Sequence, residues 1–291
     1  MKYVDIIEDT INYIEENLES DIELEYLAKR FYLSKFYFHR IFTAVMGVTL
    51  KEYISKRKLN YALELLNSTN IPMVEIALTI GYGTQESFIR AFKGSYGITP
   101  GAIRRSEVNI ELVGIPEIVE RTFKNLNSDV VTDFSFVEKQ EMNLVGFFTK
   151  VDLDDKDIQM KVSEKVKMFI ENPKIKKILN RSDAFSVFFA NKDSSRVIDT
   201  FLGIENLLGL SEDRDLSTLV IPSMLYAKLR YKGDLLFIGE TVVKDIHRWM
   251  KISKIEVEPM DISFMQLYDK EYNENLEFEL HLPIHRLPQG M

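Results

Sequence analysis

The chain contains Phe38-His39-Arg40-Ile41-Phe42, and a close copy, Phe88-Ile89-Arg90-Ala91-Phe92, occurs fifty residues later. A glycine and a threonine follow each copy at the same distance: Gly47 and Thr49 after the first, Gly97 and Thr99 after the second. Two small helical units of one type in a single chain indicate a surface that repeats along its target. A DNA groove returns with every helical turn, so the repeat favours DNA as that target.

Each copy is predicted to be the second helix of a helix-turn-helix unit. In the first unit, apolar residues at three- and four-residue spacing predict a scaffold helix over residues 23–31. Ser34 then marks the start of the second helix, because its hydroxyl can accept from the free N–H groups of the first turn. In that helix, Phe38 and Phe42 are expected to face the core.

The second unit repeats this pattern. Val74, Ala77 and Leu78 are expected to form the inner face of its scaffold helix. Gly81 lies at the expected turn, and Thr84 is the expected cap of the following helix. Between the two units, apolar residues at helical spacing over 50–66 predict a stiff connecting helix.

The outer faces of the two second helices carry side chains suited to reading bases. Arginine presents a planar fork that can bond guanine O6 and N7 together, and glutamine can do the same with adenine N6 and N7. The DNA-contacting residues predicted on and beside these faces are Ser34, Lys35, His39, Arg40, Thr84, Gln85, Glu86 and Arg90. Further basic residues would contact phosphates and set the register; they are Lys51, Lys56, Arg57, Lys58, Lys93, Arg104 and Arg105.

The charge of the whole chain, −8, hides a strong regional asymmetry. Residues 1–25 carry one basic and nine acidic residues, net −8. Residues 26–106 carry twelve basic and four acidic residues, net +8, and residues 107–291 carry 24 and 32, net −8. The positive charge is therefore confined to the segment that holds the repeat, where release of counterions from DNA would favour binding.

Residues 1–106 resemble the two-unit DNA-binding domain of the AraC/XylS transcription regulators, and most closely their Rob-like branch. The motifs that carry the resemblance lie at residues 34–42, 76–82, 87–93, 96–100 and 104–105. The resemblance implies that Phe36, His39 and Arg40 of the first reading helix approach one major-groove segment. It implies that Gln85, Glu86 and Arg90 of the second reading helix approach the next. Phe36 and His39 stand where relatives often carry Trp and Gln, and Glu86 replaces a frequent second Gln, so the operator sequence cannot be copied from a relative.

The second half of the chain is predicted to be a separate α+β module. A strand at 144–151 is followed by a helix over 158–179, interrupted at Pro173, and by strands at 184–190 and 200–204. The series then restarts with a strand at 224–231, a helix over 236–250 and strands at 262–268 and 277–284. Strand–helix–strand–strand, present twice, predicts a pseudo-symmetric pair of sheets with a cleft between them.

This half resembles the GyrI-like effector-binding domain. The resemblance rests on Pro222, residues 226–233, Thr241, Ile246, Trp249, and residues 264–269 and 279–284. It implies that Glu279 lies in a cleft lined by aromatic residues, for which Trp249, Tyr226 and Tyr268 are the candidates. A carboxylate among aromatic rings suits a small cationic or amphipathic ligand, because ring faces and the carboxylate both attract a cation. The alternative is a solvated sheet face, since the strand period places Glu279 and His281 on the same side.

The sequence therefore predicts a multidomain transcription regulator. We expect a DNA-binding domain over 1–106, a connecting segment over 107–135 and the effector-binding domain over 136–288. The expected partners are double-stranded DNA, a small-molecule effector and RNA polymerase. Two alternatives for the C-terminal module stay open. The first is hydrolysis of a small electrophile through a cleft carboxylate acting as general acid and base, and the second is binding of a protein.

Other features exclude further classes of function. The chain has no cysteine, so neither disulfides nor thiolate metal sites can form. Gly81-Tyr82-Gly83 lacks the third glycine of a dinucleotide turn, and four histidines supply no obvious catalytic triad. We expect no cofactor, no metal and no enzyme activity. The absence of a leader or a long apolar run predicts a cytoplasmic protein without a membrane segment.

Overall fold

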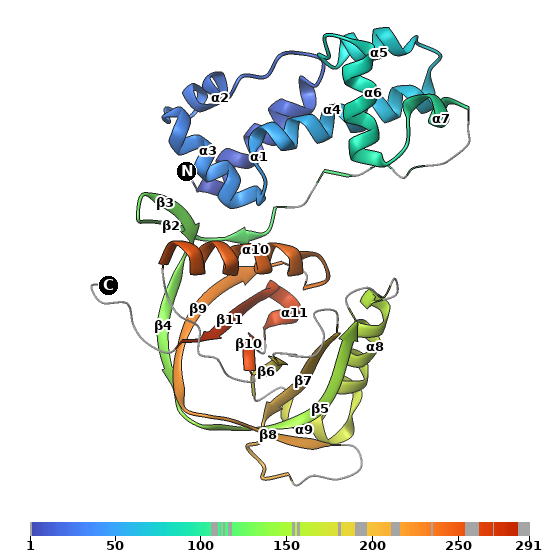
Figure 1. The fold of residues 1–291 in the computed structure, drawn as a ribbon. Coiled ribbons are helices and arrows are strands. Elements are labelled where there is room, and N and C mark those ends of the chain that lie inside the picture. The colour runs from blue at the N-terminus through green and yellow to red at the C-terminus, as the bar shows by residue number, and fades with distance from the viewer. Residues whose placement is uncertain are drawn as a thin grey trace. The chain divides into compact units, whose positions relative to one another are not determined.

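The computed structural model describes residues 2–105, 110, 112, 114–115, 118–152, 155, 158–179, 182–189, 197–210, 216–233, 235–253, 262–269 and 271–284. The chain forms two compact units, Met1–Ile118 and Val119–Met291, drawn in Figure 1. The first unit is helical and the second combines a large sheet with helices, which confirms the predicted fold class.

The first unit consists of the following helices: α1 (Tyr3–Glu16), α2 (Leu24–Arg30), α3 (Lys35–Met46), α4 (Leu50–Ser68), α5 (Met73–Thr79), α6 (Gln85–Tyr96) and α7 (Pro100–Arg104). The pairs α2–α3 and α5–α6 are the two predicted helix-turn-helix units. The long helix α4 connects them (Figure 1), as the apolar spacing over 50–66 predicts.

The repeated residues serve as helix caps. The Ser34 hydroxyl accepts from the Tyr37 N–H at 3.2 Å, and the Thr84 hydroxyl accepts from the Ser87 N–H at 3.1 Å. Both reading helices end in a glycine with left-handed backbone, at φ of 68° for Gly47 and 74° for Gly97. The threonine two residues after each glycine caps the next helix, α4 or α7. The duplicated motif thus contains a reading helix, the glycine that ends it and the threonine that caps the next helix.

Apolar residues of the repeat form the cores of the two units. The four predicted phenylalanines are fully buried: Phe38, Phe42, Phe88 and Phe92. The inner face of α5 differs from the prediction, because Ile76, Ala77 and Ile80 are buried while Val74 and Leu78 are 45% and 59% exposed. The helix is only seven residues long, so its buried stripe is narrower than the apolar spacing suggests.

The second unit begins with four strands: β1 (Glu120–Arg121), β2 (Phe123–Leu126), β3 (Asp129–Thr132) and β4 (Phe134–Lys139). Its first half continues with β5 (Met142–Asp152), α8 (Ile158–Glu171), α9 (Pro173–Leu179), β6 (Ala184–Phe189) and β7 (Val197–Glu205). After β8 (Ser217–Ile221), its second half contains β9 (Met224–Lys232), α10 (Leu235–Ser253), β10 (Ile262–Tyr268), α11 (Tyr272–Asn275) and β11 (Glu277–Pro283).

Strand–helix–strand–strand indeed occurs twice, and each half has the same strand order. The order is β5-β7-β6 in one half and β9-β11-β10 in the other, and β6 pairs with β10. The expected pair of sheets is therefore one continuous antiparallel sheet, with nine strands among the described residues. Strands β1 to β3 and the first residues of β4 occupy the segment expected to connect the domains. Sequence reasoning missed them because they are short, and it also missed β8.

The two faces of the sheet have different neighbours. On one face, β9 and β11 pack against α10, with Leu229, Leu280 and Trp249 in the same core. Helices α8 and α9 cover β5 and β7 on that same face, around Val145 and Ile204. The other face is called here the inner face. It is formed by every second residue of the strands of both halves. Figure 1 shows that the sheet curves strongly around this inner face.

A glycine pair lies where two strands approach closely. Gly146 of β5 pairs with Gly203 of β7. A Cβ on Gly146 would lie 1.9 Å from the Leu202 carbonyl oxygen, and a Cβ on Gly203 would lie 2.5 Å from the Phe201 ring. No side chain larger than hydrogen fits at either position without movement of the backbone or of that ring.

Candidate DNA interface and effector site

The predicted base-reading residues lie at equivalent positions of α3 and α6. An offset of fifty residues matches Phe36 with Glu86 and Arg40 with Arg90. Phe36 is 81% exposed, and Glu86 and Arg90 are also exposed. Lys35 is exposed as well, whereas His39, Arg40 and Gln85 are half-buried. The two reading helices therefore present different side chains on the same framework.

The two arginines differ in their surroundings. The Arg40 guanidinium carbon lies 5.5 Å from the centroid of the Tyr37 ring, one helical turn earlier. The Tyr37 hydroxyl in turn shares a hydrogen bond with the hydroxyl of Tyr3 in α1. Arg40 is thus packed against its own helix, while Arg90 extends from an exposed position.

Several residues expected to contact DNA also have hydrogen-bond partners within the first unit. Ser34 and Thr84 use their hydroxyl oxygens as caps. Arg57 donates through two nitrogens, each at 2.8 Å, to the carboxylate of Glu15 in α1, and its side chain is only 12% exposed. Lys58 donates to the Ser20 carbonyl oxygen at 2.9 Å. Arg57 and Lys58 thus each have a partner inside the fold, and their contact with phosphates stays a prediction.

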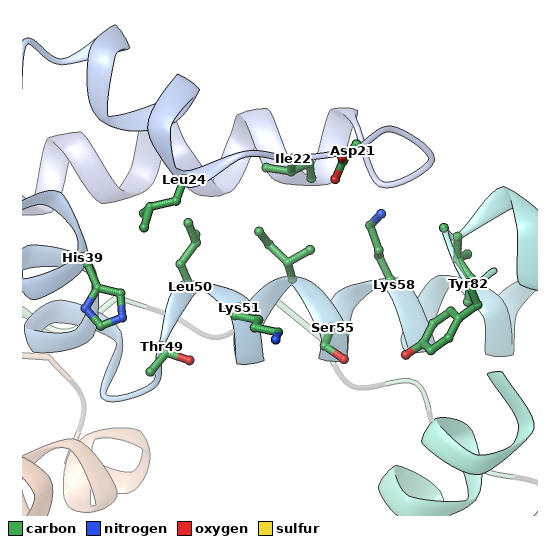
Figure 2. Close-up of a pocket in the computed structure, with 13 residues that line it drawn as sticks. Asp21, Ile22, Leu24, His39, Thr49, Leu50, Lys51, Ser55, Lys58 and Tyr82 are labelled. Carbon is green, nitrogen blue, oxygen red and sulfur yellow. The ribbon is translucent and has the colours of Figure 1, made fainter. Parts of the chain in front are cut away.

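A hollow of about 540 Å³ lies along α4, beside the first reading helix and the turn of the second unit (Figure 2). Its apolar lining comes from Ile22, Leu24, Leu50, Ile54 and Ile80. Its polar lining comes from Asp21, His39, Thr49, Lys51, Ser55, Lys58 and Tyr82. His39 and Lys51, both predicted DNA contacts, therefore belong to one continuous concave surface.

In the second unit, Glu279 lies on the inner face of the sheet and is surrounded by hydrogen-bond donors. Its Oε1 accepts from Lys228 Nζ at 3.0 Å and from an Arg230 nitrogen at 3.1 Å. Its Oε2 lies 3.0 Å from His281 Nε2. Pairing of β11 with β9 places these residues together, because Glu279 lies opposite Arg230 and His281 opposite Lys228.

These contacts and burial shift the pKa values of Glu279 and His281. The hydrogen bond from His281, with those from Lys228 and Arg230, holds the pKa of Glu279 far below its ordinary value, so the carboxylate is ionised. Burial lowers the pKa of His281, which favours the neutral ring. A neutral His281 that donates from Nε2 to Glu279 leaves Nδ1 as a hydrogen-bond acceptor.

The structure divides the four predicted effector residues between the two faces of the sheet. Tyr226 lies on the inner face with Glu279, and its ring centroid is 5.9 Å from that of His281. Trp249 is fully buried against Phe134 on the opposite face, at 5.1 Å between ring centroids. Tyr268 packs on that opposite face too, and its hydroxyl donates to Gln266. Trp249 and Tyr268 are therefore core residues of the α10 side.

The inner face contributes residues that sequence reasoning did not select. Lys228 and Arg230 neutralise Glu279, and the half-buried Lys139 of β4 lies close enough for Glu279 to affect its pKa. Phe148 is 56% exposed and contacts Phe201, with ring centroids 4.8 Å apart. The alternation of β9, with Lys228 and Arg230 on the side of Tyr226, was the available signal. The pairing of β9 with β11 is needed to show that these two cations contact Glu279.

Comparison with known proteins identifies a family for each half of the chain. Residues 27–106 match the profile of a helix-turn-helix domain, and residues 132–285 match that of the GyrI-like small molecule binding domain. The chain belongs to the AraC family of regulators and carries a GyrI-like domain. This combination confirms the Rob-like architecture expected from the sequence.

Individual relatives match one half each. The Tn10 TetD protein of Escherichia coli is 38% identical over 103 residues, which cover 35% of this chain and 75% of TetD. The regulatory protein SoxS of E. coli is 35% identical over 104 residues, covering 36% and 97%. For the second half, the structure of SAV2435 bound to tetraphenylphosphonium matches with a TM-score of 0.40 and 10% identity, over 53% of this chain and 94% of that one.

Two kinds of feature are missing from the described residues. No helix there combines the length and apolar character that a membrane crossing requires. Likewise, no cluster of three or more potential metal ligands occurs in the part of the chain that the structure describes.

Proposed function

We propose that this AraC-family regulator binds a specific operator through α3 and α6 in successive major-groove segments. The observation that carries the proposal is the shared framework of the two helices, with the same caps and the same arginine position. The net charge of +8 over residues 26–106 supplies the attraction to phosphates. Because one chain carries both readers, a single copy can occupy both segments of the operator.

The GyrI-like domain, in this proposal, senses a small amphipathic molecule in the cytoplasm. The inner face of its sheet combines the polar cluster around Glu279 with the exposed ring of Phe148. Binding of the effector would bias operator affinity or contact with RNA polymerase. A cationic effector, suggested by Glu279 alone, stays a prediction.

The first test is selection of bound DNA from a random pool, followed by titration of Arg90→Ala on the selected operator and on scrambled DNA. We expect the substitution to cost about 1–3 kcal/mol on the operator and less on scrambled DNA. Lys29→Ala removes one charge from the exposed face of α2 and should leave the ratio of the two affinities unchanged. Equal ratios for wild type and Arg90→Ala would contradict reading by α6.

The second test concerns sensing. The full chain would be titrated with candidate effectors, and both operator affinity and the recovered compound would be measured. A change in operator affinity with unchanged compound supports a sensor. Turnover of the compound that depends on Glu279 would instead identify the domain as a hydrolase.

A further inference from the structure

A tyrosine occupies a strained backbone position in the turn of the first helix-turn-helix unit. Tyr32 lies between α2 and α3 with a φ of 57°, in the left-handed region that glycine adopts without strain. Its N–H donates to the Lys29 carbonyl oxygen at 3.1 Å. In the second unit, the Gly81 N–H makes the equivalent bond to the Leu78 carbonyl oxygen at 3.0 Å, and Gly81 has a φ of 84°. The same turn is therefore built once with glycine and once with tyrosine.

Packing within the first unit does not account for this tyrosine. Tyr32 is 98% exposed, so its ring gains almost nothing from the fold. The neighbouring ring does the packing, since Phe31 stacks on the buried Phe38 with 6.1 Å between ring centroids and 8° between ring planes. A glycine at position 32 would keep the turn and remove the strain. Backbone strain that the fold itself does not use is typical of functional positions, so a binding partner is the better explanation.

The charge of the segment around the turn favours an anionic partner. Residues 26–51 contain no acidic residue, and their basic residues are Lys29, Arg30, Lys35, Arg40 and Lys51. At the start of α2, Glu23 and Glu25 act on Lys29, and Glu25 pairs with it at 2.8 Å. With both acids included, residues 23–51 carry five basic and two acidic residues, net +3. A chain of phosphates is the anionic partner that fits a positively charged segment of a DNA-binding unit.

Tyr32 adjoins the end of α3 that carries the predicted DNA contacts. Ser34 caps this helix, and the exposed Lys35 and Phe36 are its first two residues. In helix-turn-helix proteins the N-terminal residues of the second helix contact base edges, and hydroxyl groups nearby contact phosphates. A residue two positions before the cap therefore lies at the edge of the groove that α3 is proposed to enter. A phenol there offers a neutral hydrogen-bond donor to the phosphates.

We propose that Tyr32 binds the phosphate backbone of the operator beside the major-groove segment that α3 enters. Its hydroxyl donates to a phosphate oxygen, and its ring packs on the adjoining sugar. Such a contact sets the register of α3 and carries no base specificity. The first unit keeps a strained tyrosine because the DNA-bound state uses the ring, whereas Gly81 leaves the second unit without this contact. The inference rests on the proposed binding of operator DNA and adds one contact to it.

The test compares Tyr32→Gly and Tyr32→Phe with the wild type, all in the full chain. Tyr32→Gly should raise the thermal midpoint of the first unit, followed by circular dichroism, and weaken binding to operator and scrambled DNA about tenfold each. Tyr32→Phe keeps the strain and loses the hydroxyl, so the midpoint should stay and both affinities should fall about fivefold. The salt dependence of binding should not change, because no charge is lost. Unchanged affinity in both variants, or a lower midpoint for Tyr32→Gly, overturns the proposal.

Modified DNA locates the contact. A methylphosphonate, in which a methyl group replaces one phosphate oxygen, is placed at each position of the selected operator in turn. At one phosphate beside the segment read by α3, this change should weaken the wild type about tenfold and weaken Tyr32→Phe much less. If every position gives the same ratio for the two proteins, no phosphate accepts from Tyr32 and the contact is refuted.

Two further variants separate this inference from the proposed function. Leu276 in the second unit also has a left-handed backbone, with a φ of 56°, so Leu276→Gly removes strain of the same kind and should leave DNA affinity unchanged. If Arg90→Ala loses operator preference while both Tyr32 variants bind as the wild type does, DNA reading stands and this inference fails. If the wild type binds no DNA, both fail. If the Tyr32 variants keep their DNA affinity but their operator complexes bind RNA polymerase more weakly, the turn docks a protein and the phosphate contact is wrong.

Discussion

Loss of one partner from the buried pair Arg121–Asp245 should destabilise the second unit strongly. Arg121 Nε lies 2.6 Å from Asp245 Oδ2, and the two side chains are 1% and 5% exposed. The Tyr231 hydroxyl donates to the same carboxylate at 3.2 Å. Arg121→Met keeps the apolar stem of the side chain but removes the ionic partner of Asp245, so that the Tyr231 hydroxyl is the donor left to its carboxylate among the described contacts.

The expected loss follows from this geometry. Breaking a buried ion pair on one side costs about 3–5 kcal/mol, because the remaining charge stays desolvated. The hydrogen bond from Tyr231 moderates the cost, so we expect about 3 kcal/mol. The double variant Arg121→Met/Asp245→Leu removes both charges and should lie within about 1 kcal/mol of wild type. With a urea dependence of about 2 kcal/mol per molar, the single variant should unfold about 1.5 M earlier.

The assay is urea unfolding followed by tryptophan fluorescence. Trp249 is the single tryptophan of the chain, and it packs in the same core as Tyr231, so the signal reports on the second unit alone. The first unit can unfold separately without affecting the result. If the single and double variants lose the same stability, the charge left on Asp245 is not the cause and the reasoning fails.

Three further outcomes are expected. Lys51→Ala should weaken binding to operator and scrambled DNA alike and reduce the salt dependence of binding by about one counterion, measured by titration at several salt concentrations. Arg57→Ala should lower the thermal midpoint of the first unit, followed by circular dichroism, and leave that salt dependence unchanged, because Arg57 is paired with Glu15. The second unit should lose stability to urea as pH falls below about 6.5, because burial lowers the pKa of His281 and the unfolded chain binds the proton more readily. Protonation of Glu279, whose pKa is also lowered, adds a further loss below about pH 4.5, and His281→Gln should flatten the upper part of this profile.

Local signals made the first unit predictable from the sequence. Ser34, Gly47 and Thr49 act on the backbone within three or four residues of themselves, so their effect can be read directly. The alternation over 224–231 also predicts a strand without any knowledge of its neighbours. The failures lie where the structure depends on distant partners. Strand β1 has only two residues, and it is a strand because it pairs with β9.

The same distinction separates the predicted site residues. Exposure of Phe36, Glu86 and Arg90 follows from the helical period of α3 and α6, so these positions could be selected correctly as outward-facing. Arg57 also faces outward in such a projection, yet Glu15, forty-two residues away, takes its guanidinium. The faces of Trp249 and Tyr268 depend on how α10 and β10 meet the sheet, which no local pattern contains.

Glu279 shows how strand register decides the chemistry of a site. Read alone, residues 277–282 present a carboxylate and an imidazole on one face, which favours a cation. The register of β11 against β9 places Arg230 opposite Glu279 and Lys228 opposite His281, so that two cations of β9 already pair with the carboxylate. A slip of one residue would turn those cations to the α10 side and leave the carboxylate unpaired. Substitutions at Lys228 or Arg230 on β9 therefore change the charge beside Glu279 while the glutamate on β11 stays the same.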